Sequence, residues 1–194
     1  MSVINKLRSA DTVLFLDEVQ YSHGGFTNRN RMPDGSWLTV PVCRDTDMAP
    51  LNRVRISEHD DWRRNHVKTL YQHYGHNGLV EAVCAEIMRP YRLLIGLNLA
   101  LLRFVLDPRV WQFQSHLDGG RAEVAVSEDR TELAPISERL AMMVAEVGGD
   151  VYLSGPSGRN YLDEIPFLDR GIEVRYWSHT GPNPCVLETS LDRR

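Results

Sequence analysis

The first residues that could carry chemistry form the stretch Asp17-Glu18-Val19-Gln20. It follows residues 12–16, a continuous apolar run whose β-branched and aromatic side chains predict a buried strand. Ligands of open α/β sheets bind beyond the carboxyl ends of the strands, so Asp17 could act as a base or hold a substrate amine or hydroxyl. A solvated strand end, or a cap on a turn, is the alternative interpretation.

Two amides and two guanidinium groups are crowded together at Asn28, Arg29, Asn30 and Arg31. The planar fork of arginine matches phosphate and carboxylate groups, and an asparagine amide can both donate to a sugar and accept from it. The pattern therefore predicts a contact to a polar or anionic substrate group. An exposed, solvated loop is the alternative.

A histidine stands on the apolar face of a predicted helix. The helix begins at Trp62 and ends before Gly75, and His66 shares one face with Trp62 and Leu70. A buried, hydrogen-bonded histidine is the first interpretation, and an acid/base role is the second. His73 lies on the same face, but nothing marks a third ligand, so no metal is predicted.

The last candidate is the turn Ser154-Gly155-Pro156-Ser157-Gly158, which follows a short strand predicted at residues 150–153. Backbone N–H groups in such a glycine-containing turn can cradle an anion. The turn is not a P-loop, because the Gly-Lys-Ser/Thr ending is missing, and it is not a G-x-S-x-G elbow. A tight turn that caps the next helix is the alternative.

The remaining elements decide how these segments are positioned. Hydrophobic periodicity and turn residues predict helices at residues 79–88, 91–106 and 131–147, and further strands at residues 37–42, 110–114 and 173–177. This order predicts an α/β fold, with a single domain, a small and mainly parallel sheet, and a helical segment around residues 60–106.

Composition excludes several classes of protein. The 194 residues carry 22 basic and 26 acidic side chains, and a net charge of −4 disfavours nonspecific binding to nucleic acid. The longest apolar run, residues 93–106, is interrupted by polar residues and is too short to span a bilayer. Three widely spaced cysteines without a CxxC pair indicate free thiols and a cytoplasmic protein.

Five stretches, taken in order, resemble the WbqC-like protein family of bacteria. The matching residues are Phe15-Leu16-Asp17-Glu18-Val19-Gln20-Tyr21, Asn28-Arg29-Asn30, Trp37-Leu38-Thr39-Val40-Pro41-Val42, Trp62 with His66, Lys68, Thr69 and Leu70, and Tyr152-Leu153-Ser154-Gly155-Pro156 with Gly158, Tyr161, Leu162 and Asp163. Each motif alone is weak, but five in the same order are specific. The resemblance implies a WbqC-like domain over residues 1–178 that lacks the first strand of the family, followed by a polar tail over residues 179–194.

Family members occur with genes for surface-polysaccharide and specialised-metabolite assembly, so the resemblance implies a biosynthetic enzyme. The expected reaction is transfer of a small acyl or aminoacyl group, from a donor that can be carrier-linked, to an amine such as an amino sugar. A noncatalytic binding or scaffold partner in the same pathway is one alternative. A metal-dependent hydrolase that uses His66, His73 and Asp17 is another. No cofactor and no oligomeric state is identified.

Within this resemblance the candidate residues take hypothetical roles. Asp17 is the base or the carboxylate that orients the amine, and His66 is the second acid/base group. The substrate-binding residues are Gln20, Asn28, Arg29, Asn30, Ser154, Gly155, Gly158 and Tyr161.

Overall fold

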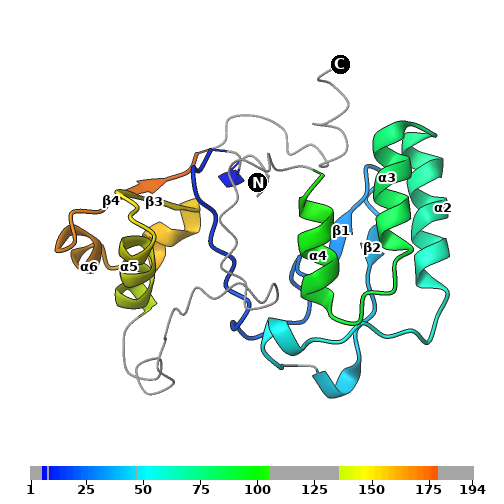
Figure 1. Ribbon diagram of the computed structural model, residues 1–194, viewed down its shortest axis with the longest axis horizontal. Coiled ribbons are helices and arrows are strands. Elements are labelled where there is room, and N and C mark those ends of the chain that lie inside the picture. Colours follow the sequence, from blue (N-terminus) through cyan, green and yellow to red (C-terminus); the bar gives the residue numbers. More distant parts are fainter. Residues whose placement is uncertain (1–5, 8, 47, 105–135, 179–194) are drawn as a thin grey trace.

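The computed structural model describes residues 6–7, 9–46, 48–104 and 136–178. Its elements form two groups, which lie on opposite sides of the view in Figure 1. The first group comprises the strands β1 (Arg29–Arg31) and β2 (Trp37–Thr39), the 3-10 helices η1 (Arg44–Thr46) and η2 (Leu51–Arg53), and the helices α2 (Trp62–Tyr74), α3 (Gly78–Ile87) and α4 (Leu94–Leu102). The second group comprises α5 (Ile136–Glu146), β3 (Val151–Ser154), the 3-10 helix η5 (Pro156–Asn160), α6 (Ile165–Leu168) and β4 (Glu173–Tyr176).

Helices α2 and α3 pack side by side as a helical hairpin. Helix α2 ends at Gly75, whose φ of +67° favours a residue without a Cβ and whose N–H donates to the Tyr71 carbonyl. Asn77 caps α3, because its Oδ1 accepts from the Val80 N–H at 3.1 Å. The predicted end of the helix before Gly75 is therefore confirmed, and Asn77 begins the next helix.

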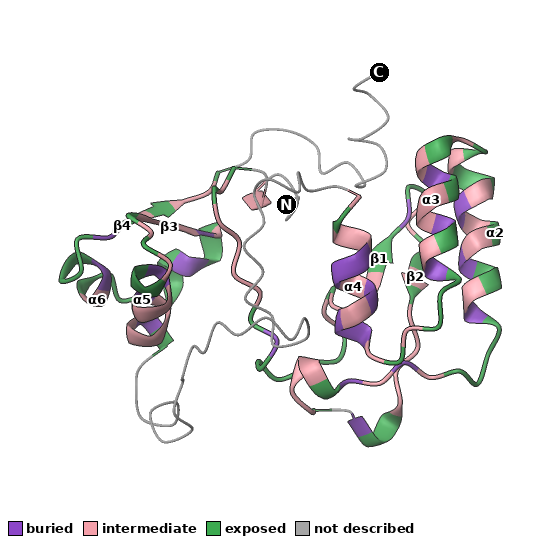
Figure 2. Ribbon diagram, viewed as in Figure 1, coloured by how far each residue is buried: buried purple, intermediate pink, exposed green. Residues whose placement is uncertain are grey.

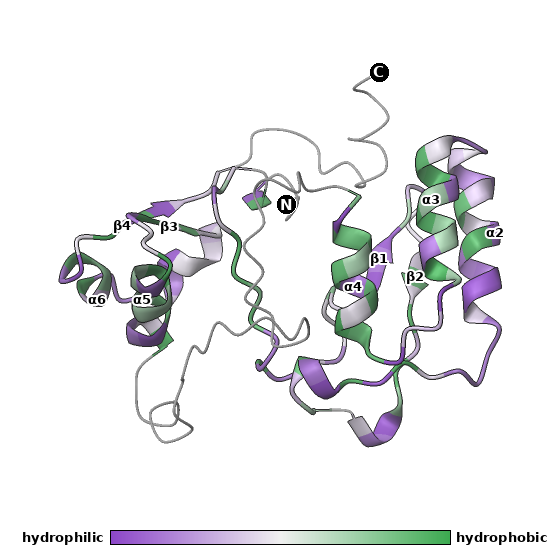
Figure 3. Cartoon of the chain, in the orientation of Figure 1, coloured by the Kyte–Doolittle hydropathy of each residue, from purple (hydrophilic) through white to green (hydrophobic). Residues whose placement is uncertain are grey.

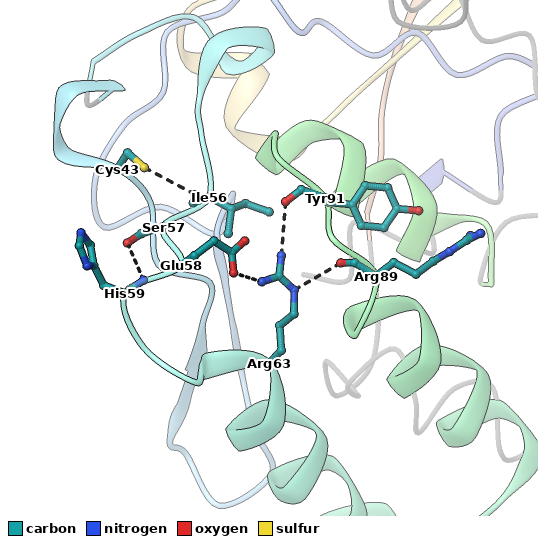
Figure 4. A network of polar contacts seen from close by, with 8 residues as sticks. All are labelled: Cys43, Ile56, Ser57, Glu58, His59, Arg63, Arg89 and Tyr91. Atoms are coloured by element: carbon teal, nitrogen blue, oxygen red, sulfur yellow. Dashed lines mark hydrogen bonds and ion pairs between the residues drawn. The ribbon is translucent and has the colours of Figure 1, made fainter.

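Arg63 fixes the first turn of α2 to the connection between α3 and α4 (Figure 4). Its guanidinium donates to the carbonyl oxygens of Arg89 and Tyr91, each at 3.3 Å, and pairs with Glu58. In the same region, the Cys43 thiol donates to the Ile56 carbonyl at 3.5 Å. These contacts hold three separate segments around the N-terminal end of α2.

The first hydrophobic core lies where α2, α3 and α4 meet the two short strands (Figure 2). Helix α4 is apolar on almost every side, and five of its nine residues are buried. This pattern, visible in Figure 3, is the one expected for a helix enclosed by its neighbours. The most deeply buried side chains of this core are Tyr21, Val54, Val80, Leu94 and Leu97.

Strands β1 and β2 form an antiparallel hairpin in which Arg31 lies opposite Trp37. The turn between them contains Asp34 and Gly35, as the turn chemistry of the sequence predicts. Asp34 Oδ1 accepts from the Ser36 N–H at 2.9 Å, and Gly35 has a φ of +85°. The strand predicted over residues 37–42 ends earlier, at Thr39.

The buried strand predicted at residues 12–16 is wrong. These residues do not adopt strand conformation, and most of their side chains are half-buried. The chain beyond them pairs instead with residues 49–52: the Asp17 carbonyl accepts from the Asn52 N–H at 2.8 Å, and the Val19 carbonyl accepts from the Leu51 N–H at 3.0 Å. Asp17 therefore follows an irregular segment and does not mark the carboxyl end of a strand.

The second core is built around the parallel pair β3 and β4, with Val151 opposite Glu173. Helices α5 and α6 pack together, and α6 lies in the connection between the two strands. The buried side chains are Ala141, Val144, Phe167 and Ile172. The Tyr152 ring stacks on the Phe167 ring with centroids 5.0 Å apart.

The mixed α/β class predicted from the sequence is confirmed, with one parallel and one antiparallel pair of strands. Helix α4 begins at Leu94 rather than residue 91, because the preceding residues are extended and bridge Arg55. The predicted strand 110–114, the start of the predicted helix 131–147 and the predicted tail 179–194 lie outside the described residues. Across the ranges that the structure describes, no helix is both long enough and apolar enough to cross a membrane.

Candidate functional site

The segment that carries Asp17 lies between the two groups of elements. Asp17 is only 5% exposed, whereas its neighbours Glu18 and Gln20 are exposed. Glu18 pairs with Arg139 of α5 at 3.7 Å, which links this segment to the second core. Gln20 Nε2 donates to the Met48 carbonyl at 3.2 Å. A buried carboxylate thus lies in a segment whose next residues contact both groups of elements.

Two buried polar atoms at this junction were not anticipated from the sequence. Asn52 Oδ1 and Arg139 Nε are buried without a hydrogen-bond partner in the described part of the chain. The backbone of Asn52 bonds to that of Asp17, and Arg139 contacts Glu18. A buried polar atom without a partner is costly, so each such atom calls for an explanation, and a bound water, ion or ligand is one of them. Each is a single polar residue outside any motif, and no sequence signal distinguishes it.

The turn after β3 holds its serine inward. Ser154 is 1% exposed, and its hydroxyl donates to the Gly155 carbonyl at 3.2 Å. The Gly158 N–H donates to the Gly155 carbonyl at 2.9 Å, which closes the first turn of η5. The predicted turn is therefore present. The Ser154 hydroxyl and the Gly158 N–H already donate to the Gly155 carbonyl. An anion bound at this turn would therefore have to accept from other N–H groups of the turn.

Tyr161 belongs to an aromatic surface on the second core. It is 61% exposed and lies near the half-buried Tyr152, whose pKa is raised chiefly by burial and further by the neighbouring Tyr161 phenol. The Tyr176 hydroxyl donates to Glu164 Oε1 at 2.6 Å, and the Arg159 guanidinium lies 4.3 Å from the Tyr176 ring centroid. Phenol hydroxyls and a guanidinium on one surface offer donors to polar ligand groups.

The polar residues at 28–30 are engaged inside the hairpin. Asn28 Nδ2 donates to the Val40 carbonyl at 3.0 Å, and Asn30 Oδ1 accepts from the Arg31 N–H at 2.9 Å. Arg29 donates to the carbonyls of Gly25, at 3.1 Å, and Gly24. Its guanidinium also lies 4.2 Å from the Trp37 ring centroid. These contacts shape the loop before β1, and leave part of each side chain for a ligand.

His66 is buried behind β2. Its Nε2 lies 3.0 Å from the Thr39 carbonyl, and because a carbonyl can only accept, Nε2 must carry the proton. The ring packs edge-on against Trp62 with centroids 5.0 Å apart. Burial lowers the pKa of His66, and the Thr39 bond opposes this effect only in part. The geometry matches the first interpretation of the sequence, a buried and hydrogen-bonded histidine, and leaves Nδ1 for any acid/base role.

The structure does not gather the predicted residues at one place. His66 and residues 28–30 lie with α2, β1 and β2, whereas Ser154, Gly155, Gly158 and Tyr161 lie with β3 and η5 on the other side of Figure 1. Asp17 and Gln20 lie in the segment that the Glu18–Arg139 pair joins to the second core.

The histidines of α2 do not form a metal cluster with Asp17. His73 Nε2 instead lies 3.4 Å from Asp34 Oδ2 of the hairpin turn. No group of three or more His, Cys, Asp or Glu side chains is arranged to hold a metal ion within residues 6–7, 9–46, 48–104 and 136–178.

Comparison with known proteins agrees with the motifs. The profile of the WbqC-like protein family matches residues 3–184. The uncharacterized protein Rv1507c of Mycobacterium tuberculosis is 26% identical over 174 residues, which cover 88% of this chain and 74% of that protein. No solved structure matches the chain significantly. The family match extends over more than nine-tenths of the sequence, so the chain belongs to the WbqC-like protein family.

Proposed function

We propose that the protein transfers a small acyl or aminoacyl group to the amine of a substrate at the junction that contains Asp17. The observation that carries the proposal is the buried Asp17 carboxylate, 5% exposed, in a segment flanked by the polar groups of Asn52 and Arg139. A carboxylate that is kept inside a protein needs polar compensation, and catalytic acids and bases are held in such surroundings.

The hydrogen-bonding types of the junction fit an amine acceptor. The carboxylate of Asp17 and the side-chain oxygen of Asn52 are both acceptors and suit the N–H groups of an amine, whereas the guanidinium of Arg139 donates and suits an oxygen of the acyl donor. Asp17 would take the proton as the amine nitrogen attacks the acyl carbonyl. The new C–N bond forms while the leaving group departs with the electron pair of the bond that breaks.

The broader assignment rests on the family resemblance. The acceptor would be an amino sugar or related amine, and the donor could be carrier-linked. The reaction would serve the assembly of surface polysaccharide or a specialised metabolite in the cytoplasm. Gln20 and Tyr161 stay candidates for substrate contact because both side chains are exposed.

The test is to incubate the purified full chain with amino sugars and a simple acyl thioester, and to follow N-acylated product by mass spectrometry. Asp17→Asn should lower kcat by about 100-fold or more, because general-base catalysis contributes about 100- to 10,000-fold. Asp60→Asn, at an exposed position before α2, is the matched control and should keep the wild-type rate. Unchanged turnover in Asp17→Asn would remove this residue from the mechanism.

A noncatalytic partner is the second candidate function. It is favoured by the bonds that His66 and Arg29 already make to backbone carbonyls, because residues in those roles hold the fold rather than do chemistry. In that case an amino sugar would bind to the wild type, as measured by isothermal titration calorimetry, but incubation with the acyl thioester would give no N-acylated product. Product formation by the wild type would contradict this candidate.

A further inference from the structure

An open, shallow groove lies along α2, away from the Asp17 junction. It has a volume of about 670 Å³. Helix α2 supplies most of the lining, including Arg64, Val67, Lys68 and Tyr71, and His76 and Met88 line the groove near the two ends of the α2–α3 hairpin.

The floor of the groove is apolar and adaptable. Val67 and Tyr71 are half-buried, and Met88, just beyond α3, is 46% exposed. The His76 ring stacks on the Tyr71 ring with centroids 4.0 Å apart, which holds both rings at one end. Methionine and aromatic side chains in exposed grooves can adjust to the apolar face of a partner.

The rim of the groove is positively charged. Arg64 and Lys68 are four residues apart and therefore lie on the same face of α2, which contains no Asp or Glu. Lys68 makes no ion pair with a described residue. Arg64 pairs with Asp61 at 3.3 Å, but both side chains are more than 60% exposed and the pair is weak. Two available cations stand here in a chain whose net charge is −4.

The spacing of the lining residues along α2 fits an elongated occupant. Arg64, Lys68 and Tyr71 follow one another along α2, and eight residues of helix span about 12 Å, or two turns. A small anion would use the cations and leave the apolar floor exposed to water. A helix with an apolar stripe and flanking carboxylates would cover the floor and pair with both cations.

We propose that the α2 groove is a docking surface for an acidic amphipathic helix of a partner protein. The apolar stripe of that helix packs on Tyr71 and Met88, and its carboxylates face Arg64 and Lys68. This mode of recognition places anchors on successive turns of a helix in an apolar groove. The proposal does not depend on the chemistry at Asp17.

The probe for the experiment is a synthetic acidic peptide with leucines at helical spacing and glutamates on both flanks. A matched peptide carries lysine in place of every glutamate. Each is titrated at low ionic strength into the ¹⁵N-labelled full chain, and amide shifts are followed by NMR. The acidic peptide should shift amides of α2 and the end of α3, and added salt should weaken it because exposed charges are screened.

Charge reversal makes the test specific. Lys68→Glu should weaken the acidic peptide by about tenfold or more, since each 1.4 kcal/mol of lost interaction is a tenfold change in Kd. The double variant Arg64→Glu with Lys68→Glu should instead prefer the lysine peptide. Arg44→Glu, an exposed arginine of η1, is the control and should bind as the wild type does.

Three outcomes would overturn the proposal. The first is that both peptides bind the wild type equally, and the second is that Lys68→Glu binds the acidic peptide as tightly as Arg44→Glu does. The third is that inorganic phosphate reproduces the shifts while the acidic peptide binds no better, which would make the groove a site for small anions.

Discussion

The Ser154 hydroxyl lies directly against the backbone of Gly158. A Cβ placed on Gly158 would lie 2.1 Å from Ser154 Oγ and 3.0 Å from a methyl carbon of Leu162. Ser154 is 1% exposed, so its side chain cannot move aside into solvent, and Leu162 is half-buried. The glycine at position 158 is therefore required by a close approach between the turn and the end of β3.

Gly158→Ala should destabilise the protein by about 1–3 kcal/mol, the usual cost of overpacking a well-filled site. Urea unfolding measures the change. Gly155→Ala is the matched control, because its Cβ would meet nothing closer than 4.0 Å and its φ of −72° suits alanine. Adding Ser154→Ala to Gly158→Ala should recover part of the loss, since the closest clash is with the hydroxyl. Equal stability of Gly155→Ala and Gly158→Ala would show that the turn shifts enough to make room for the new methyl group, and would contradict the prediction.

The pH dependence of stability should contain a contribution from His66. Burial lowers its pKa in the folded state below the value of 6.5 in the unfolded chain. The unfolded state therefore binds the proton more readily, so stability is lost as the pH falls below about 6.5 towards the folded pKa. His66→Gln retains a donor to the Thr39 carbonyl but does not titrate.

Urea unfolding between about pH 7 and pH 5 tests this, because histidines change charge in that range. The wild type should lose more stability over the interval than His66→Gln. Replacement of the exposed His59 by glutamine is the control and should leave the wild-type slope. The same pH dependence in the wild type and His66→Gln would contradict the expected shift.

Arg29→Lys should lower the free energy of unfolding by about 1–2 kcal/mol. Lysine cannot donate to the carbonyls of both Gly24 and Gly25 with the geometry of a guanidinium, and hydrogen bonds from charged groups contribute in this range. Arg31→Lys, whose exposed guanidinium lies farther from the Trp37 ring at 5.7 Å, should cost less. Equal free energies of unfolding for the two lysine variants would show that the contacts of Arg29 contribute little to stability. Arg29 would then be better explained as a ligand-binding residue.

Phe167→Ala should loosen the second core without affecting the first. The ring is fully buried, and such truncations cost about 3–5 kcal/mol. Hydrogen exchange should speed up in α5, β3, α6 and β4, whereas α2, α3 and α4 should keep their protection. A matched Leu97→Ala variant, in the first core, should give the opposite pattern. Uniform loss of protection in either variant would show that the two cores unfold together.

The sequence predicts most of the helices and the parallel pair because their signals are local. Helix α2 has an apolar face and a glycine stop, β3 is a short, mainly apolar run next to a turn, and β4 alternates polar with apolar residues. Residues 12–16 have the same apolar character as a strand, but pairing depends on a neighbour that is distant in the sequence. That long-range condition is why this strand is absent although β3 and β4 form.

The candidate site shows the same limit. Asp17 and His66 stand out by residue type, and their burial follows from the fold. Asn52 and Arg139 are isolated polar residues far apart in the sequence, and only the pairing of residues 17–19 with 51–52 and the Glu18 ion pair place them near Asp17. A site assembled from tertiary contacts leaves no spacing pattern for a single sequence to reveal.

The separation of the two cores has a consequence for how the sequence can change over evolution. Among the described residues the two buried clusters have no member in common. When a substitution makes a buried side chain smaller, only a larger side chain in the same cluster can fill the cavity. Substitutions that compensate each other should then fall into two independent blocks of positions across relatives. Glu18 and Arg139 form an ion pair across the junction. Substitutions at these two positions should therefore be correlated with each other, although they belong to different blocks.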